Sequence, residues 1–167
     1  MRARRQPQLD LRLNAATLDA AERWHEGALV AYLGGTLRLH LSSEYAEAKQ
    51  VAEELHLPLP PEATPRQIQD CAEAWLRTQA MRHLNDLIMQ KSALAGRRAS
   101  RLVLSFATGD HWVKAADATT LRCHWRLIEQ PAAVIESVIS RALTSLPQEA
   151  PAHDLFSLPS CRYPHNV

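Results

Sequence analysis

The segment Leu121-Arg122-Cys123-His124-Trp125-Arg126-Leu127 is followed shortly by Pro131 and a patterned run to Leu146. Apolar and polar residues alternate in the first segment, which predicts a strand with one buried face. The run after Pro131 has apolar residues at helical spacing and is followed by Pro147, which predicts a helix that begins and ends at prolines. The apolar positions of that helix are Ile135, Val138, Ile139, Ala142, Leu143 and Leu146. Together the two segments predict an α+β fold.

A long helix is predicted before this region. Thr64-Pro65-Arg66-Gln67 places a cap, a first-turn proline and a capping-box glutamine in order. We expect the helix to run from there to the Ser92–Gly96 region. Its predicted core stripe is Ile68, Cys71, Ala72, Trp75, Gln79, Leu84, Leu87 and Ile88. Cys71 is therefore interpreted as a core residue without a redox or metal role.

Shorter elements are predicted around the long helix. Residues 29–33 and 36–41 read as a hairpin, and Gly34-Gly35 is expected to supply the positive φ angles of its turn. Leu37, Leu39 and Leu41 should face the core, with His40 on the other face. A helix is favoured from Ser42 to about Glu54, although residues 55–59 alternate like a strand. A short helix is expected to end at Gly27, and Arg101–Phe106 should pair with Leu121–Leu127 in a hairpin-like arrangement after a turn at residues 108–110.

Composition limits the possible classes of protein. The chain has 167 residues, 46% of them hydrophobic and 22% charged, which fits one soluble domain. We expect a polar, basic segment at residues 1–20 and a single domain at residues 21–167. The formal charge of +1 gives no overall attraction for nucleic acid or anionic membrane. Three scattered cysteines, no apolar run of roughly 20 residues and no signal-peptide pattern predict a cytoplasmic protein without a membrane role.

Several short motifs have the order and spacing of one known family. They are Tyr32-Leu33-Gly34, Ala74-Trp75, Asp110-His111-Trp112-Val113-Lys114-Ala115, and His124-Trp125-Arg126-Leu127-Ile128 followed by a proline and Val134-Ile135. With these residues the chain resembles the YgjP-like family, a zincin-type group of zinc metallopeptidases. The resemblance implies a small zincin-like core, with antiparallel strands packed against a long helix and a former active-site helix. It also implies extended structure between Ser42 and Leu59, in conflict with the helix favoured above.

The zinc-binding helix of that family carries H-E-x-x-H, and the matching positions here are Arg141, Ala142 and Ser145. In this motif two histidines on one helical face bind zinc, and the glutamate is the general base. Arginine offers no lone pair, alanine accepts no proton, and serine is a weak neutral ligand. His153 resembles the family's third ligand, but one histidine does not hold zinc.

The resemblance thus implies a catalytically inactive protein without zinc, and we expect it to act by binding a protein or peptide partner. Two alternatives stay open. One is a metal-dependent hydrolase whose site has moved to His111, His124 and His153, with Cys123, Cys161 and His165 as further ligand types. The other is a nucleic-acid-binding module that uses arginines Arg2, Arg4, Arg5, Arg97, Arg98, Arg101, Arg122 and Arg126.

Three structural expectations follow. The Pro131–Leu146 helix should pack against the strands that hold Leu104 and Trp125. Trp112 and Trp125 should be largely buried. Arg141 should replace the lost zinc as a fixed cation beside Glu149 or Asp154, or else extend into solvent along its apolar stem.

Overall fold

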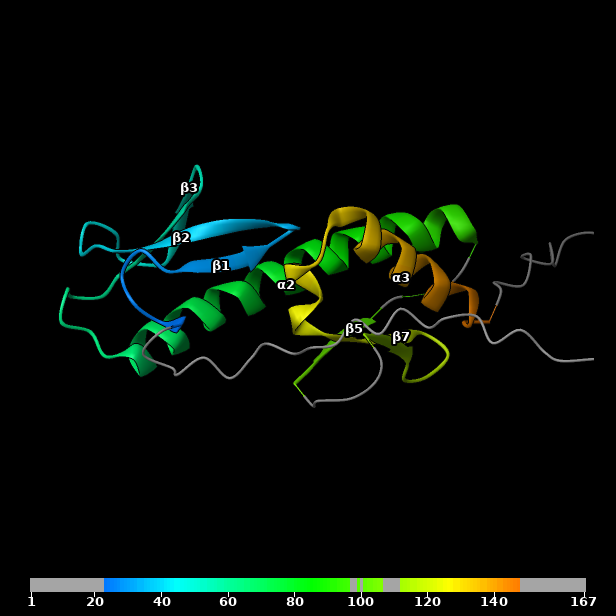
Figure 1. Ribbon diagram of the computed structural model, residues 1–167. Helices are drawn as coiled ribbons and strands as arrows, with labels where there is room; N and C mark the ends of the chain where they lie inside the picture. The colour runs from blue at the N-terminus through cyan, green and yellow to red at the C-terminus, as the bar shows by residue number, and fades with distance from the viewer. Residues whose placement is uncertain (1–22, 97–98, 100, 107–111, 148–167) are drawn as a thin grey trace, which may run out of the picture.

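The computed structural model describes residues 23–96, 99, 101–106 and 112–147. In this part, one long helix crosses the molecule, and two sheets and a second helix pack along it (Figure 1). The elements in chain order are β1 (Leu29–Tyr32), β2 (Gly35–Leu41), β3 (Lys49–Val51), β4 (Glu54–Leu57), α2 (Pro65–Ala95), β5 (Arg101–Ser105), β6 (Val113–Ala115), β7 (Thr120–His124), the 3-10 helix η1 (Trp125–Glu129) and α3 (Ala132–Thr144). The α+β class is confirmed.

The two sheets are mixed rather than purely antiparallel. The first has the order β1-β2-β4-β3 and the second the order β5-β7-β6. Each contains one parallel pair, β2 with β4 and β5 with β7. The expected hairpin-like pairing of residues 101–106 with 121–127 is therefore wrong, because the antiparallel partner of β7 is β6. The expected turn at residues 108–110 lies outside the described residues.

The helix α2 begins and ends as its sequence predicts. Thr64 Oγ1 accepts a hydrogen bond from Gln67 N at 3.3 Å, and Gln67 Oε1 accepts one from Thr64 N at 2.9 Å. This reciprocal capping box precedes Pro65, and Gly96 ends the helix in the left-handed region at φ 58°. The buried residues are Ile68, Ala72, Glu73, Trp75, Leu76, Ala80, Leu84, Ile88 and Ser92. Gln79, Cys71 and Leu87, which were placed in the stripe, are only partly buried.

The first hairpin is confirmed, with a shift in its turn. Leu29 pairs with Arg38 and Tyr32 with Gly35 in an antiparallel register. The positive φ angles belong to Leu33 (48°) and Gly34 (81°), so Gly35 already begins β2. Gly34 is also required for space, since a Cβ atom there would lie 2.7 Å from the Cα of Pro131. The hairpin turn is therefore packed against the chain that joins η1 to α3.

The helix expected from Ser42 to about Glu54 is wrong. This region contains β3 and β4, joined by a turn in which Ala52 has φ 52°. The extended structure implied by the family resemblance is the one observed. Leu55 and Leu57 of β4 are fully buried next to Leu39 of β2, so burial on the sheet outweighs the helical spacing of the preceding residues.

The segment after β7 also departs from its predicted form. Trp125 to Leu127 were expected to continue the strand, but they lie in η1. Their burial agrees with the alternating pattern, since Trp125 and Leu127 are buried. The short helix predicted to end at Gly27 begins on residues that the structure does not describe. Its described end is helical only at Arg23, and residues 24–27 form a bend and a turn.

The last helix begins after Pro131 and ends near Pro147, as predicted. Ile135, Ile139 and Leu143 are its buried residues. Its most extensive contacts are with α2 and with β6, so it packs against the β6 edge of the second sheet rather than mainly against the strand of Leu104. Within the described residues, no helix is both long and apolar enough to cross a membrane.

Candidate functional site

The positions that the sequence matched to a zinc motif lie at the C-terminal end of α3. Arg141 and Ser145 are exposed, and Ala142 is partly buried against the core. The Ser145 hydroxyl donates a hydrogen bond to Ala142 O at 2.6 Å, so its proton is used within its own helix. This end of α3 presents a guanidinium, a methyl group and a bonded hydroxyl, none of which is a strong zinc ligand.

Arg141 has no ion pair among the described residues, and its side chain lies on the exposed side of α3. The open placement agrees with the alternative in which the guanidinium extends into solvent. Glu149 and Asp154, the acidic partners proposed for it, lie outside the described residues, as does His153. The substitute-cation interpretation therefore stays a prediction.

His124 is the one described member of the relocated hydrolase site. It lies at the end of β7, where its Nδ1 accepts a hydrogen bond from Arg126 N at 3.2 Å and so caps η1. Its ring lies between Trp112 and Trp125, with centroid distances of 6.0 and 6.3 Å. Burial, with a smaller contribution from the nearby Arg126 charge, lowers the pKa of His124. A neutral imidazole with one nitrogen occupied serves here as a cap and packing group.

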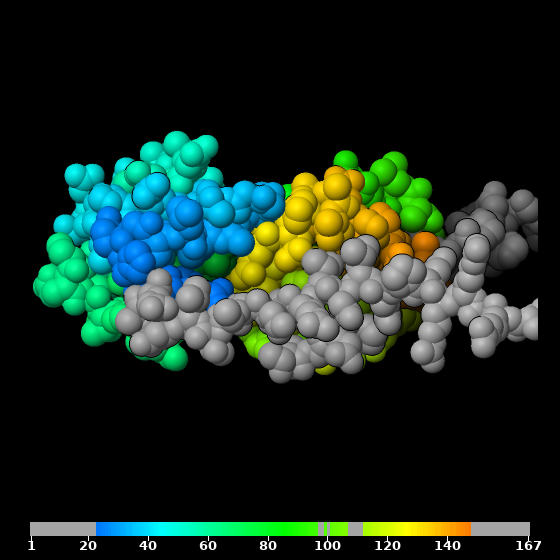
Figure 2. All heavy atoms as spheres, viewed as in Figure 1, coloured from blue at the N-terminus to red at the C-terminus, as the bar shows by residue number. Residues whose placement is uncertain are grey.

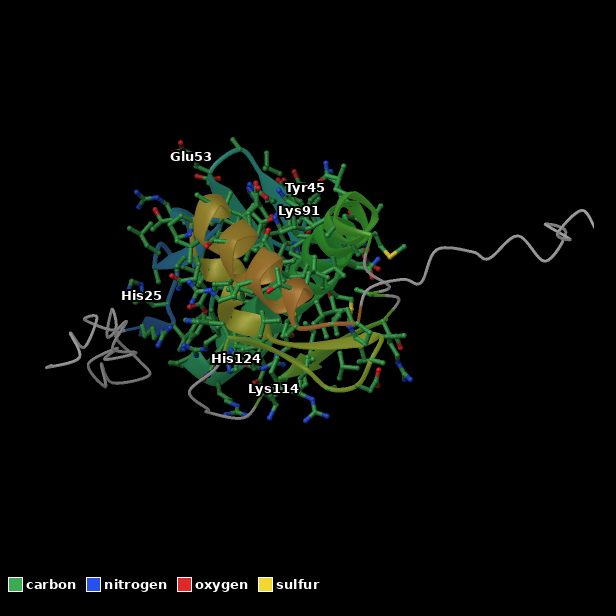
Figure 3. All side chains as sticks on the ribbon, turned by 90° about the vertical axis from the view of Figure 1, so that its right-hand side faces the viewer. His25, Tyr45, Glu53, Lys91, Lys114 and His124 are labelled. Carbon is green, nitrogen blue, oxygen red and sulfur yellow. The ribbon has the colours of Figure 1, made fainter. Side chains whose placement is uncertain are left out.

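A second histidine group lies on the first sheet. His40 and His56 are opposite each other in the parallel β2–β4 pair, with ring centroids 4.8 Å apart. Glu26 Oε1 lies 2.7 Å from His40 Nδ1, and the Tyr45 ring meets the His56 ring edge-on. Figure 3 shows Tyr45 on the upper side and His124 on the lower side, so the two histidine environments are separate. Within the described ranges, no group of three or more ligand side chains is arranged to hold a metal ion.

A pocket of about 250 Å³ opens between β1, η1 and α2. Leu29 and Ala31 of β1 line one side, and Trp125, Arg126 and Glu129 of η1 line the other. Figure 2 shows this hollow between the blue atoms of β1 and the yellow atoms of η1, with green atoms of α2 at its floor. Three elements that are distant in sequence therefore form one recess.

Glu73 supplies a buried charge at the floor of the pocket. Its residue is 8% exposed, and its carboxylate accepts hydrogen bonds from Gln69 Nε2 at 2.9 Å and from Arg77 Nη2. The Arg77 guanidinium also lies over the rings of Trp125 and Phe106. Glu73 is thus held by partners on its own helix, as a buried carboxylate requires.

Arg126 and Glu129 are held less tightly than Glu73. Arg126 Nη2 lies 4.0 Å from Glu73 Oε1, and Arg126 Nε lies 3.9 Å from Glu129 Oε1. Both distances exceed the range of a hydrogen bond. The Arg126 guanidinium lies over the Trp125 ring, 5.1 Å from its centroid, although its side chain is only 27% exposed. The pocket thus holds charged groups that have capacity for further hydrogen bonds.

Burial is the largest influence on Glu129, and it raises the pKa of this carboxyl group. The positive charges of Arg126 and Arg23 act in the opposite direction. Arg23 also lines the pocket, and its guanidinium lies over the Trp24 ring at 5.5 Å. Two arginines therefore flank Glu129 from different segments of the chain.

A family model described as "YgjP-like, metallopeptidase domain" matches residues 6–140. The chain belongs to the YgjP-like family. The matched range includes both sheets, α2 and η1, and it ends within α3 just before Arg141. No curated protein and no solved structure matches the chain.

Sequence reasoning did not single out Glu73 and Glu129, which the structure places in this pocket. The sequence pattern could have indicated Glu73 as a paired carboxylate. It lies four residues after Gln69 and four before Arg77, on a helix face next to Ala72 and Leu76. No local sequence pattern indicates Glu129, since its position follows from the 3-10 helix that lies beside β1.

Proposed function

We propose that this chain is a catalytically inactive YgjP-like protein that acts by binding a protein or peptide partner. One observation carries the proposal: the end of α3 that matches the zinc motif carries Arg141, Ala142 and Ser145. None of these residues supplies a metal ligand of ordinary strength or a general base for water. A fold of this family without its catalytic groups retains its surfaces, and binding is the activity that surfaces alone can perform.

Metal analysis and a peptidase assay test the loss of catalysis. The protein purified without chelator should contain no stoichiometric zinc and should cleave no peptide. A triple variant with Arg141→His, Ala142→Glu and Ser145→His restores the two histidines and the glutamate, and we expect it to bind more zinc than the wild type. Stoichiometric zinc in the wild type, lost together with peptide cleavage on chelation, would contradict the proposal.

Selection from a library of random displayed peptides tests the binding activity. A related set of sequences should be enriched on the folded protein and not on the heat-denatured protein. Synthetic peptides of the enriched sequence should then bind the folded protein in titration calorimetry. If repeated selections enrich no related sequences, the chain is not a peptide-binding protein of the kind proposed.

A further inference from the structure

The strand β1 lies at one edge of the first sheet, and no described residue pairs with the outer side of two of its residues. In the antiparallel register, residues that bond to β2 alternate with residues whose N–H and C=O groups point away from it. Arg38, opposite Leu29, donates its N–H to Glu53 on the side away from β1, which fixes this alternation. Leu29 and Ala31 therefore direct their backbone groups to the free edge.

The same edge closes at its C-terminal end. Leu33, the next residue in the alternation, donates its N–H to Ile128 O of η1 at 2.8 Å. Within the described part of the chain, no hydrogen bond reaches the outer side of Leu29 or Ala31. An added strand can therefore pair with these two residues and has to end where Leu33 bonds to Ile128 of η1.

The charged pocket lies beside this open edge, since Leu29 and Ala31 both line it. The charged residues that line it are Arg23, Arg126, Glu73 and Glu129. Arg77 and Gln69 already hydrogen-bond the Glu73 carboxylate, so Glu129 is the carboxylate that remains without a hydrogen-bonded partner near Arg23 and Arg126 among the described residues. Neither of these two guanidinium groups has a side-chain hydrogen bond among the described residues. The excess of unused N–H donors favours an anionic group at this point.

We infer that the pocket binds the C-terminal end of a partner polypeptide, which adds as a short strand to β1 and places its terminal carboxylate beside Arg126 and Arg23. The backbone groups of Leu29 and Ala31 pair with the peptide, as in other cases of strand addition. The arginines bind the carboxylate in the recess where the edge is closed by η1. This inference rests on the proposed partner binding and adds its location and chemistry.

Two pools of random hexapeptides test the inference on the full chain, one with free C-terminal carboxylates and one with amidated C-termini. Peptides retained from the free pool should bind at least about tenfold more tightly than their amidated forms, because a charge-assisted pair is lost. Equal binding of both forms would overturn the carboxylate inference and leave the proposed function standing. No binding of either pool would overturn both.

Two further measurements locate the contact. Arg126→Met keeps most of the apolar stem and should weaken binding of the free-carboxylate peptide about tenfold. Arg122→Met, at an exposed position of β7, should leave that binding unchanged. Hydrogen exchange can be measured on the wild type without a variant. The bound peptide should slow amide exchange at Leu29 and Ala31. Exchange at Val30 and Tyr32, whose amides already bond to β2, should stay unchanged. Protection elsewhere, with these two amides unaffected, would place the peptide at another site.

Discussion

Arg126 and Arg141 are cations in opposite surroundings. Arg126 of η1 is mostly buried, lies over Trp125, and is about 4 Å from two carboxylates. Arg141 of α3 is exposed and has no ion pair in the described residues. Arg141 lies at a position that the family resemblance matches to the zinc motif. The partly buried charges of the structure lie instead around Arg126, where desolvation makes each electrostatic interaction stronger.

The end of α3 and the pocket therefore differ in burial. At the end of α3, Arg141 and Ser145 are exposed, so their substitution should affect stability little. In the pocket, the charges are partly buried and the Arg126–Glu73 contact joins η1 to α2, so a substitution there should lower the stability of the fold more.

The largest effect is expected at Trp125, which supports Arg126 and is 5% exposed. Trp125→Ala should lower the free energy of unfolding by about 3–5 kcal/mol, because it removes a large buried side chain. Trp112→Ala is the matched control, since Trp112 is only partly buried and should lose about 1–2 kcal/mol. Chemical denaturation measures both. Equal losses would show that the pocket wall at Trp125 contributes no more to stability than the β6 side of the sheet at Trp112.

The next effect is expected at Glu73. Glu73→Ala should cost about 2 kcal/mol, because it leaves Arg77 and Arg126 without their buried counter-charge, while the partial exposure of Arg77 softens the loss. Asp70→Ala breaks the exposed pair with Arg66 on the same helix and should cost less than about 0.5 kcal/mol. If both variants unfold at the same denaturant concentration, Glu73 has no special role.

A smaller, pH-dependent effect is expected from Glu129. Burial raises the pKa of this carboxyl group in the folded protein, so the folded state binds its proton more readily than the unfolded state. Ionisation of Glu129 therefore costs stability as the pH rises from the unfolded-state pKa through the raised folded-state pKa. Relative to the wild type, Glu129→Gln should gain stability across that window and keep the gain at neutral pH. A difference that does not change with pH would contradict this assignment.

The smallest effect is expected at Arg141. Arg141→Ala should leave the unfolding midpoint nearly unchanged, because the side chain is solvated. Double-mutant cycles with Glu149→Ala and Asp154→Ala test the substitute-cation alternative. A coupling above about 1 kcal/mol with either residue would exceed that of ordinary exposed pairs and would restore that alternative.

The parts of the fold that the sequence predicted correctly are those with local signals. The capping box at Thr64, the ending at Gly96 and the proline at the start of α3 each act within one helical turn. The wrong predictions have nonlocal causes. The β3–β4 turn contains Ala52 at positive φ and no glycine, so nothing local marked it as a turn.

The candidate site likewise has features that follow from local sequence and features that depend on distant contacts. The sequence by itself shows which residues stand at the positions matched to the zinc motif, Arg141, Ala142 and Ser145, because ligand chemistry belongs to each side chain. It also determined the family, through motifs that keep their spacing. Only the tertiary structure decided that β5 and β7 are parallel and that Arg126 lies near both Glu73 and Glu129 in a pocket beside β1. It also decided that no described residue bonds to the outer backbone groups of Leu29 and Ala31. The physical reason is that pairing, burial and charge proximity depend on contacts between segments far apart in the chain, and no local pattern encodes those distances.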